Sequence, residues 1–296
     1  MIVAATSLTL ECEFSDMDFS DSDFKYTCLV ENIFIRNPNT SITSVNGTHN
    51  DNNTNIDVLQ LQINEQNITY LPKELGTFFP SLNNFIVYLT SLEFLEKSDF
   101  KSFLFLEILS LTENKIATIP ENTFDDLDSL KELYLSGNRI EILHSNVFRK
   151  LVHLEIIYLS NNFIQMLPAG LFQHNTQLTT ISCQFNNIMT VGVDLFKPLK
   201  DLKTLWFNGN QCIDNFVDDN DNNLLALKEE IYEKCEDLSN FKIETTNFYM
   251  YSYFEDDADD TNDYVSPLKE SNTAKSNYNY YIKVIIFSLQ FLLIVL

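Results

Sequence analysis

The side chains best suited to chemistry in this chain are five cysteines and four histidines, which could bind a metal or pair a nucleophile with its base. Neither the Cys-x-x-Cys spacing nor the Cys/His spacing of zinc sites occurs. The sequence places no serine, cysteine or acid with a histidine as a triad requires, and it has no phosphate loop or glycine-rich fingerprint. We therefore predict no enzyme, no cofactor and no metal. The histidines are His49, His144, His153 and His174.

One acidic run resembles a calcium-binding loop. Asp219, Asp221 and Asn223 alternate, and Glu230 follows at the distance of the loop's last ligand. Leu224 stands where the loop's sharp turn needs glycine. The alternative is that these acids precede a helix, whose N-terminus favours negative charge. We prefer this alternative.

A repeat of 24 residues accounts for most of the apolar side chains. From residue 106 the pattern L-x-x-L-x-L-x-x-N-x-I-x-x-L recurs, followed by a phenylalanine. Stepping back by 24 adds two weaker units, in which Gln66 and Thr90 replace the asparagine. Seven units therefore cover residues 58–211. The pattern matches the leucine-rich-repeat template, in which L-x-L is a short strand and the asparagine turns inward to bond free backbone groups.

The predicted fold is an α/β leucine-rich-repeat solenoid with a curved parallel β-sheet on its concave face. No unit can bury its apolar side alone, so the units stack and share one core, with the phenylalanines filling the convex side. The ends of such a stack need caps, and cysteines bracket the repeats on both sides. We predict an N-terminal cap over residues 11–57, a C-terminal cap over residues 212–235, and a buried free thiol at Cys183. The predicted disulfides join Cys12 to Cys28 and Cys212 to Cys235.

Side chains of the concave face alternate with the core side chains along each strand, so they follow from the period. They form an apolar and aromatic patch, of the kind that anchors a partner. The alternatives are that these aromatic side chains pack only on each other and that the tryptophan packs under the C-terminal cap. The predicted ligand-binding residues are Ile108, Glu132, Tyr134, Ile156, Tyr158 and Trp206.

Four N-x-S/T sequons and the cysteine pairs favour a glycosylated protein of the secretory pathway. The net charge of −23 is concentrated at the two ends of the chain and disfavours nucleic acid as a partner. The predicted glycosylation sites are Asn39, Asn46, Asn52 and Asn67.

The two ends of the chain carry apolar segments. Residues 1–10 resemble a truncated signal sequence, or alternatively form a first strand of the cap. Residues 236–280 have the composition of an acidic disordered stalk. Residues 281–296 are apolar and follow small residues and a polar spacer, the layout of a glycolipid-anchor signal with attachment at Asn272. A short uncleaved membrane helix is the alternative.

Residues 12–235 resemble extracellular leucine-rich-repeat proteins with cysteine-flanked caps. The motif N-x-C-I-D-x-F at residues 210–216 is similar to the start of the C-terminal cap in secreted insect repeat proteins. The wider family includes Toll-like receptor ectodomains, adhesion proteins and mosquito complement-like factors. The resemblance implies a cell-surface adhesion or recognition module that binds a protein ligand or receptor and can form a homodimer. A soluble secreted immune recognition factor is the alternative.

Overall fold

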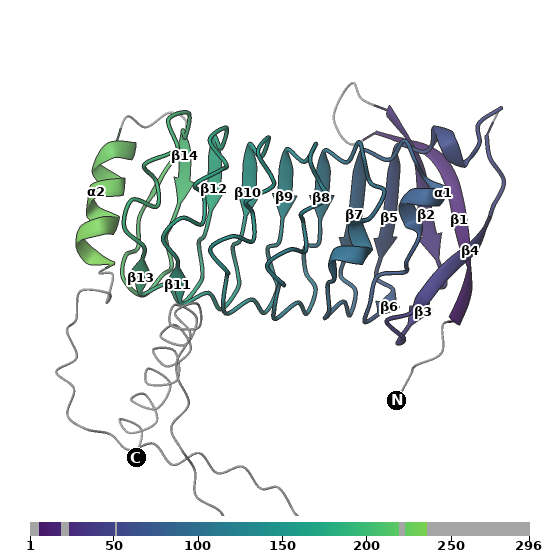
Figure 1. Ribbon diagram of the computed structural model, residues 1–296, viewed down its shortest axis with the longest axis horizontal. Helices are drawn as coiled ribbons and strands as arrows, with labels where there is room; N and C mark the ends of the chain where they lie inside the picture. Colours follow the sequence, from purple (N-terminus) through teal and green to yellow (C-terminus); the bar gives the residue numbers. More distant parts are fainter. Residues whose placement is uncertain (1–5, 19–23, 51, 219–222, 236–296) are drawn as a thin grey trace, which may run out of the picture. The chain divides into compact units, whose positions relative to one another are not determined.

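The computed structural model describes residues 6–18, 24–50, 52–218 and 223–235. Each of the seven units contributes one strand to a single parallel array (Figure 1). Neighbouring strands pair with an offset of 24 residues, as in Ile108↔Glu132 and Glu132↔Ile156. The predicted leucine-rich-repeat α/β fold with a large parallel sheet is therefore confirmed. The strands are β5 (Gln60–Asn64), β7 (Asn84–Tyr88), β8 (Ile108–Ser110), β9 (Glu132–Tyr134), β10 (Ile156–Tyr158), β12 (Thr180–Ser182) and β14 (Thr204–Trp206).

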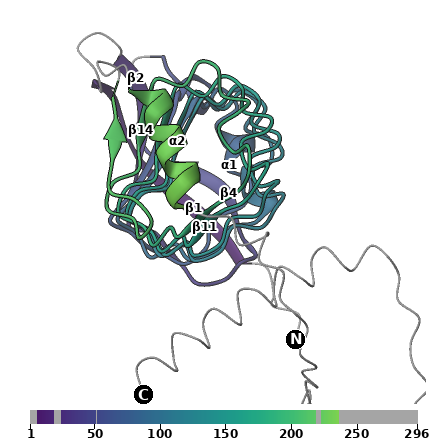
Figure 2. The same ribbon diagram turned by 90° about the vertical axis from the view of Figure 1, so that its left-hand side faces the viewer.

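The core lies behind this sheet because alternate side chains of each strand point inward. Leu109, Leu133 and Ile157 are fully buried at the centre of three successive strands. The phenylalanines also form a continuous row, in which Phe124 and Phe148 lie 6.3 Å apart between ring centroids. Seen from the end, the sheet occupies one side of the coil (Figure 2). Turns, short helices and two pairs of two-residue strands form the rest. Those short elements are η1 (Asn55–Asp57), α1 (Leu75–Phe78), η2 (Lys97–Phe100) and the paired strands β3 (Phe34–Ile35) with β6 (Asn67–Ile68) and β11 (Met166–Leu167) with β13 (Thr190–Val191).

The repeat asparagines join each unit to the one before it. The Nδ2 group of Asn162 donates to the carbonyl of Leu135, 3.0 Å away in the preceding unit, and to the carbonyl of Leu159, 3.1 Å away in its own. Its Oδ1 atom accepts from the amide of Ile140 at 3.0 Å. Equivalent bonds recur through the asparagine ladder, so buried backbone groups are satisfied at every junction. The asparagine ladder consists of Asn114, Asn138, Asn162, Asn186 and Asn210.

The residue immediately before the ladder position has a positive φ in every unit. Gly137 and Gly209 suit this conformation, whereas Leu89 (φ 51°) and Phe185 (φ 54°) adopt it with bulky side chains. The left-handed residue lies after the strand, directly before the side chain that turns inward. The aromatic ring of Phe185 lies outside the core, where it covers the backbone of Gly209.

The N-terminal cap extends the same sheet by three strands. Strand β1 (Thr6–Asp18) pairs with β2 (Phe24–Glu31) in antiparallel fashion and with β4 (Thr40–Asn46) in parallel fashion, and β2 pairs with β5. Residues 6–10 form the start of β1 and Leu10 is buried, as in the alternative that these residues are a first strand of the cap. Residues 1–5 lie outside the described part.

The junction between the cap and the first unit has the same two features as a junction between repeats. Cys28 lies opposite Leu61, so it occupies a core position of a strand. The Oε1 atom of Gln66 accepts from the amide of Ile33 at 3.0 Å, much as the ladder asparagines accept from the preceding unit. The disulfide between Cys12 and Cys28 joins β1 to β2.

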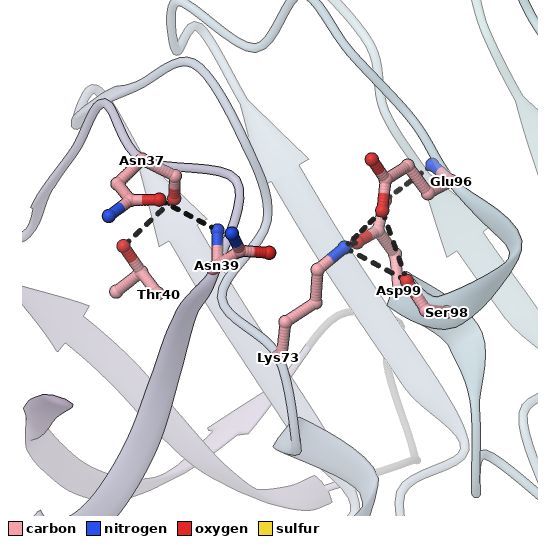
Figure 3. Close-up of polar contacts among 7 residues, drawn as sticks. All are labelled: Asn37, Asn39, Thr40, Lys73, Glu96, Ser98 and Asp99. Carbon is pink, nitrogen blue, oxygen red and sulfur yellow. Dashed lines mark hydrogen bonds and ion pairs between the residues drawn. The ribbon is translucent and has the colours of Figure 1, made fainter. Parts of the chain in front are cut away.

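A buried ion pair fixes the other side of this junction (Figure 3). The backbone of Lys73 bonds to Thr40 and Ile42 of the cap. Its Nζ atom reaches Glu96 Oε2 at 3.0 Å and also contacts the buried carboxylate of Asp99. Burial lowers the pKa of Lys73, but the hydrogen bond to Asp99 and its charge outweigh this effect and raise the pKa. One lysine therefore connects the cap to the second unit.

The C-terminal cap closes the opposite end of the stack. Strand β15 (Phe216–Val217) pairs with β14 in antiparallel fashion. Helix α2 (Leu224–Lys234) buries Leu227 and Ile231 against the last unit. The disulfide between Cys212 and Cys235 ties the end of α2 to the end of the last repeat.

Candidate binding surface

The predicted ligand-binding residues lie together on the side of the sheet that faces away from the core, which we call the open face. Ile108, Glu132 and Ile156 occupy equivalent positions on β8, β9 and β10. Tyr134 and Tyr158 form the next row, two residues further along β9 and β10. All five side chains are half-buried. The structure therefore brings the predicted patch together, but it does not test whether the patch binds a ligand.

The aromatic side chains of this face are in contact with one another. The rings of Tyr134 and Tyr158 meet edge to face, with centroids 5.1 Å apart. Tyr158 also reaches Trp206, with centroids 5.8 Å apart, although β12 lies between their strands. Ser182 of β12 is small and buried, so the two rings can approach above it. We call Tyr134, Tyr158 and Trp206 the aromatic row.

Trp206 remains part of the open face. It is half-buried and lies opposite Phe216 of the cap strand, whose side chain is 51% exposed. The cap therefore flanks the tryptophan with a second aromatic residue. The 24-residue period did not place Phe216 on the open face, because the period ends before the cap begins.

The carboxylate of Glu132 determines the electrostatics of the aromatic row. The hydroxyl of Tyr134 donates a hydrogen bond to Glu132 Oε2. Burial raises the pKa of Tyr134, and the hydrogen bond and negative charge of Glu132 raise it further. Burial also raises the pKa of Tyr158, with a smaller contribution from Glu132. Both phenols therefore stay protonated at neutral pH and can donate hydrogen bonds.

The N-terminal half of the open face has a different character. Gln60 donates to Thr27 at 3.3 Å and accepts from Asn84 at 3.2 Å, and all three residues are buried. The Nζ atom of Lys25 adds a bond to Asn84 at 3.1 Å. These polar groups satisfy one another within the sheet. Ile86 and Tyr88 alternate with the core residues of β7, so they add apolar and aromatic side chains to the open face on that strand.

The remaining predicted residues are distributed as follows. The asparagines of all four sequons are exposed, and the structure does not test their glycosylation. Cys183 is a buried free thiol, and burial raises its pKa to about 12, so it is a poor nucleophile. His49, which the sequence places in a polar loop, stacks on Phe14 with ring centroids 3.8 Å apart and bonds the hydroxyl of Tyr26.

The described residues contain no group of three or more histidine, cysteine, aspartate or glutamate side chains that could hold a metal ion. Part of the calcium-like run, the stalk and Asn272 lie outside the described ranges. Nor does the described part include a helix with the length and hydrophobicity that a bilayer-spanning segment requires.

Comparisons with known proteins point to the same repeat. Residues 80–140 match the leucine rich repeat family. No curated protein matches the chain. The 314 matching chains of solved structures include a crystal structure of a TLR13–ssRNA13 complex, with 28% identity and a TM-score of 0.49. That match covers 51% of this chain and 22% of the other. The period, the asparagine ladder and the family match together support a leucine-rich-repeat protein.

Proposed function

We propose that this chain is an extracellular recognition or adhesion module that binds a protein partner through the aromatic part of its open face. Leucine-rich-repeat scaffolds are typically binding surfaces without catalytic activity, and their extended sheets suit protein ligands. The observation that carries the proposal is the aromatic row. Tyrosine and tryptophan present large apolar area with a polar edge, and they are enriched among residues that dominate binding energy.

Two observations support a function in the secretory pathway or outside the cell. Disulfides close both caps, and such bonds persist mainly outside the cytosol. The exposed sequon asparagines are accessible for glycans. We propose retention at the cell surface by a glycolipid attached at Asn272, with a secreted recognition factor as the alternative. Release from expressing cells by phosphatidylinositol-specific phospholipase C supports the anchor, and a membrane-bound chain that still ends at Leu296 contradicts it.

The binding proposal is tested with the double variant Tyr134→Ala/Tyr158→Ala. Cell-surface proteins cross-linked to the wild-type chain are identified by mass spectrometry. The affinity of each recombinant candidate for the wild-type chain and for the double variant is then measured by interferometry. Loss of one dominant aromatic contact costs about 2 kcal/mol, so the double variant should bind about thirtyfold more weakly or worse.

The matched control is Phe34→Ala, which removes a 63% exposed aromatic side chain from β3. It should leave the affinity unchanged. Circular dichroism and the melting temperature establish that both variants are folded. An unchanged affinity in a folded double variant would contradict the proposed role of the open face.

A further inference from the structure

Glu132 is a charged residue in apolar surroundings. Its neighbours at the same level of the sheet are Ile108 and Ile156, and the rings of Tyr134 and Tyr158 lie beside it along the strands. A carboxylate in such a place loses part of its hydration, which is unfavourable unless a partner compensates. The hydroxyl of Tyr134 supplies one hydrogen bond. One neutral donor does not neutralise the negative charge.

No cation within the described part of the chain forms an ion pair with this carboxylate. The adjacent lysine, Lys131, bonds instead to Glu107, with 2.8 Å between Nζ and Oε1. Glu155 is a further exposed acid, and it directly precedes β10 as Lys131 precedes β9. Three carboxylates therefore surround one lysine, and the negative charge of Glu132 acts on both Tyr134 and Tyr158.

The Tyr158 hydroxyl is also available to form a hydrogen bond with a partner. It makes no hydrogen bond to another described residue, while its ring lies against Tyr134 and Trp206. A planar cation next to Glu132 could therefore bond the carboxylate and lie along a tyrosine ring in the same pose. Guanidinium combines these two properties, because it donates several hydrogen bonds in one plane and stacks on aromatic faces.

We propose that Glu132, Tyr134 and Tyr158 form the acceptor site for an arginine side chain of the protein partner. This inference rests on the proposed binding function of the open face and specifies the chemistry of the partner. The guanidinium donates to the free oxygen of Glu132 and packs against the tyrosines. Apolar residues on either side of the arginine fill the positions above Ile108 and Ile156. Lysine is a poorer fit, because its compact ammonium is strongly hydrated and cannot stack.

The test uses the purified full chain and a displayed library of random dodecapeptides. Four immobilised proteins are compared: the wild type, Glu132→Gln, Glu141→Gln and the Tyr134→Ala/Tyr158→Ala variant. Glutamine keeps an oxygen that accepts from Tyr134, so Glu132→Gln removes charge without removing that bond. Glu141 is an exposed acid of the same unit that lies outside the open face, so Glu141→Gln is the matched control.

Peptides selected on the wild type and on Glu141→Gln should contain arginine at about three times its input frequency, and those selected on Glu132→Gln should not. Replacing arginine by citrulline in a selected peptide should weaken binding to the wild type about tenfold and to Glu132→Gln less than about twofold. Trp206, the single tryptophan of the chain, provides the fluorescence signal for these titrations.

The remaining outcomes separate this inference from the function on which it rests. Peptides that require the aromatic row but show no arginine preference, or prefer lysine, would overturn the arginine site and leave the open face as a binding surface. Equal arginine enrichment on the wild type and on Glu132→Gln would overturn it as well. Peptide pools that do not differ between the wild type and the double tyrosine variant would contradict both proposals.

Discussion

Replacing one ladder asparagine tests how strongly the units are held together. Asn162→Ala removes a side chain whose Nδ2 group has carbonyl acceptors at 3.0 and 3.1 Å and whose Oδ1 atom accepts from the amide of Ile140 at 3.0 Å. A net hydrogen bond contributes about 1 kcal/mol, and buried groups left without partners add to the loss. The expected decrease in the free energy of unfolding is therefore about 3 kcal/mol.

Urea denaturation followed by circular dichroism measures this decrease. With a denaturant slope of about 3 kcal/mol per M, the midpoint should fall by about 1 M. Asn187→Ala is the control, because Asn187 is half-buried and its side chain makes no bond to another described residue. Its midpoint should change by less than about 0.2 M. A shift for Asn162→Ala as small as that of the control would show that the ladder is not the principal connection between units.

Three further changes have expected outcomes. Gly192→Ala should lower the melting temperature, because the new Cβ would lie 2.0 Å from the backbone nitrogen of Ala169; an unchanged melting temperature would mean that this turn can move. Lys73→Met should lower the free energy of unfolding by about 3 kcal/mol in urea titrations, because it leaves the buried carboxylate of Asp99 without its cation. Adding Asp99→Asn should restore part of this loss, and no loss in the single variant would contradict the role of the ion pair. Folding raises the pKa of Tyr134 above its usual value near 10. The contribution of the protonated hydroxyl to the free energy of unfolding should therefore be fully present below pH 10 and decrease as the pH rises above it. Urea midpoints at pH 9 and pH 11 should therefore differ less for Tyr134→Phe than for the wild type.

The repeat region could be predicted in detail because its signal is periodic. Each L-x-L segment fixes which side chains face inward, and the constant spacing then fixes the neighbours across the sheet. Ile108, Glu132 and Ile156 could therefore be placed side by side from the sequence alone, and the structure has them there. The inward asparagines followed from the same period.

Features outside the period could not be predicted in this way. The sequence left residues 1–10 open between a signal segment and a first strand of the cap, because the apolar composition fits both, and only the pairing of residues 6–10 with neighbouring strands identifies this part as strand. The bond between Glu132 and Tyr134 depends on side-chain rotamers, which a pattern of residue types does not specify. The contact of Tyr158 with Trp206 across Ser182 depends on the small size of the residue between them.

The uniform junction between units also bears on how such a chain can change in length during evolution. From β8 to β14 every junction has the same 24-residue offset, and the asparagine bonds recur at each one. Duplication or deletion of one 24-residue segment therefore creates a junction that the existing bonds already satisfy, and it leaves both caps unchanged. Each such event moves the caps by one strand spacing, about 4.8 Å. The open face can thus gain or lose a row of side chains without any change in the chemistry that holds the units together.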